Sequence, residues 1–237
     1  MSVTATYNQI TSTTVAWIGT FQIGGVYYAI RDPDILYRIE TDGTATYLRT
    51  ISGDVWGAVE CDGTYIYRAN YNYIYKINPA DGSIPCSSLC PGLRCLGIDI
   101  AGGRIFGLTN AGALYMFTTN NMTQYYVNNV GSGTYGGKMV YLNGALYIPA
   151  YGGKIKKYVV DTGVTTTLNN SLSASWLCLD TDGQYIYGTV DGGRIYRIYP
   201  DDSTTYEEVL GDGVGRFWYS NTYYNGQIWA NAYNGYC

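Results

Sequence analysis

The sequence predicts an all-β fold, a six-bladed β-propeller, from three observations. A unit of about forty residues occurs six times, each copy reads as four short strands joined by turns, and helical periodicity is absent over any useful length. Repeats of about 40–45 residues with four strands each are typical of propeller blades. We therefore assign residues 1–237 to a single β-propeller domain, because all-β domains commonly reach about 200–250 residues.

The repeat is defined by a turn residue that is followed four positions later by an aromatic residue. Successive aromatics are 39, 39, 41, 40 and 42 residues apart, and the residue before each is apolar. The Asp-Gly and Asn-Gly sequences at four of these turns favour hairpins, because these residues tolerate positive φ. The six pairs are Gly24 with Tyr28, Gly63 with Tyr67, Gly102 with Phe106, Asn143 with Tyr147, Gly183 with Tyr187, and Asn225 with Trp229.

The ends of the chain predict how the ring closes. The sixth copy stops at Cys237, where its third strand would begin, and a Thr-rich strand from Val3 to Ile10 precedes the first copy. We therefore expect the N-terminal strand to complete the last blade, which removes exposed sheet edges. The expected blades are residues 11–50, 51–90, 91–130, 131–170, 171–212, and 213–237 together with 1–10.

At the level of architecture the chain resembles the β-propeller repeat superfamily, in the manner of tryptophan–aspartate, NHL and related short-blade repeats. The resemblance covers nearly the whole chain and implies no specific family. The glycine–histidine and tryptophan–aspartate signatures of the first group are not matched, because the chain has no histidine.

Composition excludes several functional classes. Without histidine, the chain lacks the usual general base near neutral pH, the usual zinc ligand and every Ser-His or Cys-His pair. The net charge of −4 and the absence of a basic run argue against nucleic-acid binding. No apolar run approaches the ~18 residues that span a bilayer, so we expect no membrane insertion.

Location is only partly constrained by the sequence. The first residues have neither a basic start nor an apolar stretch, so we expect no signal peptide. The protein is then either intracellular or leaves the cell by another route. A virion or extracellular location is favoured by composition, since the 28 tyrosines and only 14% charged residues give the adhesive, charge-poor surface of a binding protein.

Three carboxylates occupy an equivalent position, three residues before the turn, on strands expected to line the central channel. They are Glu60, Asp99 and Asp180. One interpretation is a cation site, because oxygen ligands suit calcium or magnesium. In this respect the layout resembles six-bladed lactonases and related hydrolases, which implies a Ca²⁺ ion in the channel. The other interpretation is that each carboxylate bonds groups of the next blade, and we expect no cofactor in that case.

Tryptophan recurs seven positions before the turn in four copies, at Trp17, Trp56, Trp176 and Trp218. These residues either pack between blades or form an aromatic platform at one mouth of the channel, where rings stack on sugars or on a protein partner. Neighbouring residues that would join the platform are Asp54, Arg94, Tyr135, Asp212 and Arg216.

Three of the six cysteines, Cys86, Cys90 and Cys95, cluster in the connection between the second and third blades. Their spacing matches no common zinc module. A disulfide within this connection and free thiols are both open from the sequence, because the compartment decides between them.

These observations favour a non-catalytic binding or structural propeller, a component of a virion or tail surface that contacts other protein subunits or a surface receptor. The composition resembles that of surface proteins of phages and other viruses. The alternatives are a carbohydrate-binding lectin that uses the tryptophans, and a metal-dependent, lactonase-like hydrolase that uses Glu60, Asp99 and Asp180.

Overall fold

The structure is a computed structural model that describes most of the chain. The described residues are 17–40, 44–51, 57–131, 133, 136–150, 152–168, 175–201, 205–211, 218–224 and 226–232. These residues form strands and connections, without any helix. No helix that is long and apolar enough to cross a membrane therefore occurs in the described part of the chain.

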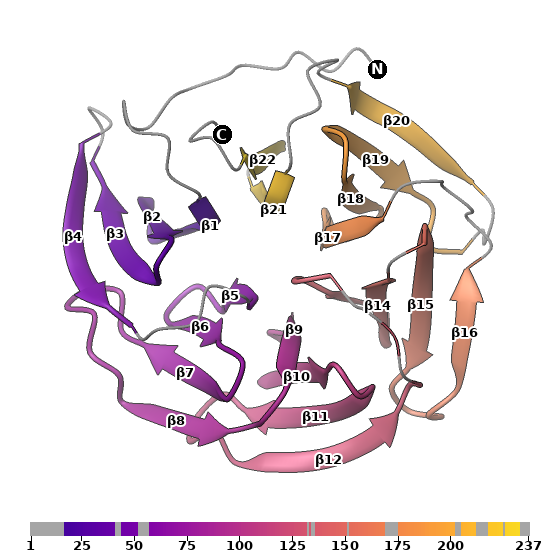
Figure 1. Cartoon of the computed structure of the whole chain (residues 1–237), viewed down its shortest axis with the longest axis horizontal. Coiled ribbons are helices and arrows are strands. Elements are labelled where there is room, and N and C mark those ends of the chain that lie inside the picture. The colour runs from indigo at the N-terminus through magenta and orange to yellow at the C-terminus, as the bar shows by residue number, and fades with distance from the viewer. Residues whose placement is uncertain are drawn as a thin grey trace.

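Six small antiparallel sheets are arranged in a ring around a central axis (Figure 1). Five sheets have four strands in sequential order, from the innermost to the outermost strand, and the sixth has two. The five four-stranded sheets are complete propeller blades, which we call blades one to five in chain order, and for brevity we call the two-stranded sheet blade six. The all-β propeller predicted from the sequence is thus confirmed.

The strands of equivalent position are as follows. The innermost are β1 (Trp17–Ile23), β5 (Val59–Cys61), β9 (Leu93–Asp99), β13 (Val140–Leu142), β17 (Trp176–Thr181) and β21 (Trp218–Tyr224). The second strands are β2 (Val26–Arg31), β6 (Ile66–Ala69), β10 (Arg104–Thr109), β14 (Ala145–Ala150), β18 (Ile186–Val190) and β22 (Gln227–Ala232). The third are β3 (Ile35–Ile39), β7 (Tyr73–Ile77), β11 (Ala113–Thr118), β15 (Lys154–Val159) and β19 (Arg194–Ile198). The outermost are β4 (Ala45–Thr50), β8 (Cys86–Leu89), β12 (Gln124–Asn129), β16 (Thr165–Leu168) and β20 (Tyr206–Gly211).

The sixth sheet differs from the prediction. It has two strands, β21 and β22, in the described part of the chain, and not four. The segment expected to complete it, residues 3–10, lies outside the described residues. The ring is nevertheless continuous between the first and last sheets, because the Thr222 hydroxyl on β21 donates to the carbonyl oxygen of Thr20 on β1 at 2.8 Å.

The hydrophobic core lies between neighbouring blades. One cluster joins blades one and two and contains Ile30 and Ile66, and another joins blades four and five and contains Ile155 and Ile186. The second strands are the most buried: β6, β14 and β18 are buried along their whole length. Each blade therefore covers an apolar face of the next, which is how a short sheet obtains a core on both sides.

In blades two and five the turn–aromatic spacing of the repeat has a local physical cause, seen most clearly in blade five. One carboxylate oxygen of Asp182 accepts hydrogen bonds from the backbone N–H groups of Gln184 and Tyr185, at 2.8 and 2.6 Å. The other oxygen accepts the Tyr187 hydroxyl at 2.8 Å. Asp62 forms the same contacts in blade two, with Tyr67 donating at 2.7 Å. The aspartate thus closes the hairpin turn and holds the aromatic residue that follows it.

A buried ion pair joins blade one to blade two. Asp34 lies in the turn between β2 and β3, and Arg68 lies on β6. The Arg68 Nη2 and Asp34 Oδ1 atoms are 2.7 Å apart, and both side chains are 0% exposed. Arg68 also donates from Nη1 to the carbonyl oxygen of Ala58 at 3.4 Å.

Replacing this arginine is expected to be costly. Arg68→Met leaves the carboxylate of Asp34 buried without its cation, which lowers the free energy of unfolding by about 3–5 kcal/mol. The matched control is Arg38→Met, because Arg38 pairs with Glu40 at 2.7 Å on the partly exposed surface, where such pairs contribute about 0–1 kcal/mol. Urea unfolding of both variants measures the difference, and equal losses would contradict a structural role for the buried pair.

Candidate functional site

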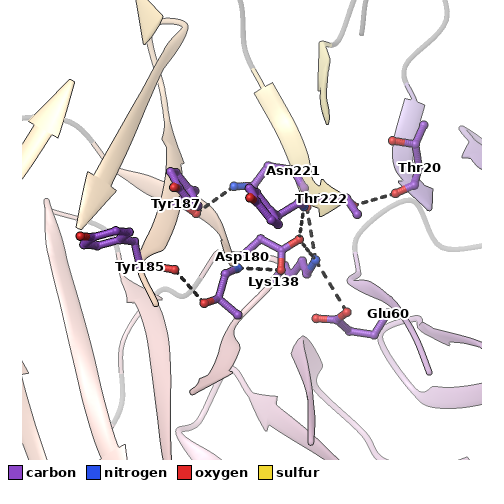
Figure 2. A network of polar contacts seen from close by, with 10 residues as sticks. Thr20, Glu60, Lys138, Asp180, Tyr185, Tyr187, Asn221 and Thr222 are labelled. Carbon is purple, nitrogen blue, oxygen red and sulfur yellow. Dashed lines mark hydrogen bonds and ion pairs between the residues drawn. The ribbon is translucent and has the colours of Figure 1, made fainter. Parts of the chain in front are cut away.

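A lysine ammonium lies at the propeller axis, between two of the carboxylates that the sequence singled out. Lys138 Nζ donates to Asp180 Oδ2 at 2.9 Å, and it lies 3.7 Å from Glu60 Oε2 (Figure 2). It also donates to the carbonyl oxygen of Asn221 at 3.3 Å. Lys138 belongs to blade four, Asp180 to blade five, Glu60 to blade two and Asn221 to blade six, so one side chain links four blades.

The backbone around Lys138 explains how it reaches the axis. Residue 138 forms parallel bridges with Leu96 on β9 and with Cys178 on β17, so the innermost segments of three blades meet there. The close fit is evident at Gly97, where an added Cβ would lie 2.9 Å from Met139. Lys138 therefore stands at a crowded position, and its long side chain reaches groups of three other blades at the centre of the ring.

Further hydrogen bonds hold Asp180 and Asn221, the two residues that accept hydrogen bonds from Lys138. Asp180 Oδ2 accepts from the backbone N–H of Tyr223 at 2.8 Å, and Asp180 Oδ1 accepts from that of Thr181 at 2.9 Å. The Asn221 side chain is buried and donates from Nδ2 to the carbonyl oxygen of Tyr187 at 2.9 Å (Figure 2). This bond fixes the orientation of the amide, because the reverse assignment would set two oxygens against each other.

Burial and charge set the protonation of the site. Burial raises the pKa of Glu60 to about 8, even though Lys138 opposes the shift. Burial lowers the pKa of Lys138, but the carboxylates of Asp180 and Glu60 raise it more, and the net shift is upward. At neutral pH the site thus holds a protonated Lys138 beside a largely protonated Glu60. A protonated lysine is neither a general base nor a nucleophile.

A small cavity adjoins the group at the axis. Its volume is about 40 Å³, which is room for a few waters. Its lining includes Phe21, Glu60, Cys61, Cys178 and Thr222. Burial raises the pKa of Cys61 to about 11 and that of Cys178 to about 12, so both are neutral thiols at neutral pH.

The predicted three-carboxylate cation site is not formed, because the three side chains do not converge. Asp99 is held within its own blade, where Arg104 donates to it from Nη2 at 2.5 Å and from Nε at 3.0 Å. Glu60 and Asp180 do converge, but the Lys138 ammonium lies between them. In the described part of the chain no three His, Cys, Asp or Glu side chains are grouped so that they could hold a metal ion.

The predicted aromatic platform is wrong for the tryptophans whose side chains the structure describes. Trp17 and Trp176 are 1% and 0% exposed. Trp176 belongs to the core cluster between blades four and five, as the alternative of packing between blades predicted, and Trp17 meets Tyr37 of its own blade edge-on at 5.8 Å. Trp176 crosses β18 at Gly188, where an added Cβ would lie 2.4 Å from the indole, and it meets Tyr196 edge-on at 5.7 Å. Glycine is therefore required beneath the ring, and the indole is part of the core.

The other residues of that prediction have different outcomes. Arg94 lies on β9, with its guanidinium 5.3 Å from the ring centre of Tyr71. Of Trp218 only the backbone is described. The remaining predicted residues lie outside the described part of the chain: Asp54, Trp56, Tyr135, Asp212 and Arg216.

The three clustered cysteines are free thiols, so of the two alternatives left open by the sequence the structure has the second. Cys90 and Cys95 are buried and Cys86 is partly buried. Cys86 and Cys90 belong to the core between blades two and three, whereas the Cys95 thiol donates to the carbonyl oxygen of Gly136.

Lys138 and Asn221 were missed by the sequence analysis, although a signal for the lysine existed. At the position five residues before the turn, five of the six copies of the repeat have a small residue. The fourth copy has Lys138 there. The small residues are Gly19, Ala58, Gly97, Cys178 and Ser220. A charged residue at a position that otherwise requires a small one indicates a special role.

Comparison with known proteins supports the fold. No family model matches the chain, and no curated protein matches its sequence. A protein of unknown function from Bacteroides thetaiotaomicron superposes with a TM-score of 0.76 at 12% identity, over 98% of this chain and 70% of that one. The extracellular domain of BT4673 from the same organism gives 0.61 at 13% identity, over 97% and 39%. BamB from Moraxella catarrhalis gives 0.57 at 11% identity, over 92% and 67%. At these identities the likeness shows a shared β-propeller fold.

Removing the axial cation is expected to destabilise the ring. Lys138→Met leaves the Asp180 carboxylate, which is only 15% exposed, without its counter-ion, and this lowers the free energy of unfolding by up to about 3–5 kcal/mol. Lys154→Met, on the exposed start of β15 in the same blade, is the control and is expected to change stability by less than about 0.5 kcal/mol. Chemical denaturation measures both, and a neutral Lys138→Met would contradict the central role of the ammonium.

Glu60 is expected to make stability depend on pH. Its pKa rises from 4.5 to about 8 on folding, so between these values the folded protein holds a proton that the unfolded chain has lost. The free energy of unfolding therefore falls as pH rises through this window, with a slope of at most about 1.4 kcal/mol per pH unit. Glu60→Gln removes this contribution. Unfolding curves from pH 5 to pH 8 should be flatter for the variant, and parallel curves would contradict the assignment.

Proposed function

We propose that this chain is a non-catalytic binding or structural propeller whose partners, other protein subunits or a surface receptor, contact its outer rim. By outer rim we mean β4, β8, β12, β16 and β20 and the turns that lead into them. The observation that carries the proposal is the contrast between the axis and the rim. The axis is closed by the Lys138 group, whereas large apolar and aromatic side chains are exposed at the rim.

The rim has the residues of a protein interface. Of the ten large apolar or aromatic side chains exposed among the described residues, five lie there. They are Tyr47, Leu89, Tyr125, Tyr126 and Val164. Tyrosine is enriched at interfaces because its ring buries a large area while its hydroxyl remains hydrogen-bonded. Scarcity of charge at such a patch reduces the cost of desolvation on binding.

The axial chemistry supports the non-catalytic part of the proposal. The lysine is protonated and paired, Glu60 is largely protonated, and Asp99 is bonded to Arg104. The cavity beside them has room for a few waters and is much smaller than the roughly 300–1,000 Å³ of typical ligand pockets. The sequence offers no histidine to act as a base.

Two finer statements belong to the same proposal. The composition, rich in Tyr, Thr, Asn and Gly and poor in charge, supports a component of a virion or tail surface. The hydrogen bond between Thr222 and Thr20 brings the last sheet against the first. This supports a six-bladed ring in which residues 3–10 provide the outermost strand of blade six.

Site-specific photo-crosslinking tests the proposal. A photoreactive phenylalanine analogue at Tyr47, on the rim, is expected to form covalent adducts with another protein when the chain is expressed in its native setting. The matched control is Tyr71, which is exposed on the turn before β7, away from the rim. Adducts from Tyr71 alone would contradict the proposal and place the binding surface on a different face. No adducts from Tyr47, together with specific hits on a glycan array, would contradict it in favour of a lectin.

A further inference from the structure

The outermost strand of each blade is an edge strand. β12, for example, ends the order β12-β11-β10-β9, and no further strand pairs with it among the described residues (Figure 1). An edge strand presents unpaired N–H and C=O groups, so it can add another strand. Proteins protect such edges by keeping them short or by placing charged residues on them.

Four of the five described outermost strands are protected in one of these ways. β8 and β16 have four residues each. β4 has six residues and bears Arg49, and β20 has six and bears Glu207 and Glu208. β12 has six residues, Gln-Tyr-Tyr-Val-Asn-Asn, without charge or proline. It therefore combines length, a central Tyr-Tyr-Val segment of high strand propensity, and absence of charge, which are the properties of a strand that pairs.

The local geometry leaves the outer edge of β12 open for pairing. Thr118 N–H donates to the carbonyl oxygen of Thr123 at 3.1 Å, so residue 123 directs its backbone groups toward β11. Because backbone direction alternates along an antiparallel strand, residue 125 also faces β11, and residues 124 and 126 direct theirs outward. The Tyr126 ring meets Tyr115 edge-on at 5.7 Å, which holds the side chain against its own blade.

We propose that β12 pairs with β12 of a second copy of this chain, antiparallel, across a two-fold axis. This inference rests on the proposed function, since it names a partner for one segment of the rim. In a two-fold arrangement the same strand supplies both sides of the interface, so each outward N–H and C=O of one copy meets its complement on the other.

Charge explains why β12 can pair with the same strand of a second copy, whereas the other six-residue edge strands, β4 and β20, cannot do so as favourably. Pairing of β4 with itself would bring Arg49 near its own copy, and pairing of β20 would bring the Glu207 and Glu208 carboxylates together. Like charges on paired strands are destabilising. The charges on those two strands are each of one sign, which opposes self-pairing in particular, and β12 bears none.

The dimer is expected to be reversible. Pairing of two six-residue strands buries less than the roughly 1,200 Å² of a standard stable interface. The purified full-length chain should therefore shift from monomer to dimer as its concentration increases in sedimentation-velocity ultracentrifugation.

A matched pair of lysine variants locates the interface. Tyr126→Lys places a charge on each copy beside the two-fold axis and is expected to raise the dimer dissociation constant by at least about tenfold. Ile100→Lys is the control, because Ile100 lies in the turn between β9 and β10 of the same blade, away from the outer rim, and is 61% exposed, as Tyr126 is. It should leave the dissociation constant unchanged. Circular dichroism and the melting temperature confirm that both variants are folded.

Two outcomes would overturn the inference. One is a wild-type chain that remains monomeric at every concentration, and the other is an equal effect of the two lysine variants on the dissociation constant. Neither outcome affects the proposed function if Tyr47 still crosslinks to another protein. Tyr126→Pro gives a second measurement, because it removes an outward N–H without adding charge, and it too should shift the equilibrium to monomer.

Discussion

The ammonium group of Lys138 is the contact on which the centre of the ring depends. Adjacent blades share apolar cores, but blades two and six are not neighbours of blade four in the ring and share no such core with it among the described residues. The lysine makes direct polar contacts to both, through Glu60 and the carbonyl oxygen of Asn221, and to blade five through Asp180. A buried cation must be paired to be tolerated, so its three contacts require these blades to keep a fixed distance from the axis.

The fold was predictable because each copy of the repeat is local in sequence, and in two copies the cause of the spacing is visible. In blades two and five the turn aspartate bonds the backbone of its own hairpin and the tyrosine that follows, all within six residues of sequence. Such local constraints leave a regular spacing that sequence analysis can detect. The sheet order, the strand positions and the central placement of Glu60 and Asp180 follow from that spacing.

The chemistry of the axis was less predictable because it depends on contacts between distant segments. The carboxylates share a repeat position, which suggested that all three act together, but Asp99 has Arg104 five residues away and is held by it. Lys138 lies at a different repeat position from the acids it contacts, so only a comparison of the copies column by column distinguishes it. For Trp176 the information that favours burial lies on the neighbouring strand. Gly188 on β18 has no side chain, and this leaves space for the indole ring in the core.

The hydrogen bond between Thr222 and Thr20 has a consequence for the order of folding. The two residues are 202 positions apart in the chain, whereas the contacts within each blade are local. Contacts between residues far apart in sequence form slowly, because the loop that they close costs conformational entropy. During synthesis, individual blades can form as they leave the ribosome, but Lys138 must wait for Asn221 before its last partner exists. The Lys138 ammonium of the nascent chain thus lacks one of its hydrogen-bond acceptors until the final sheet arrives, and this favours late, cooperative closure of the ring.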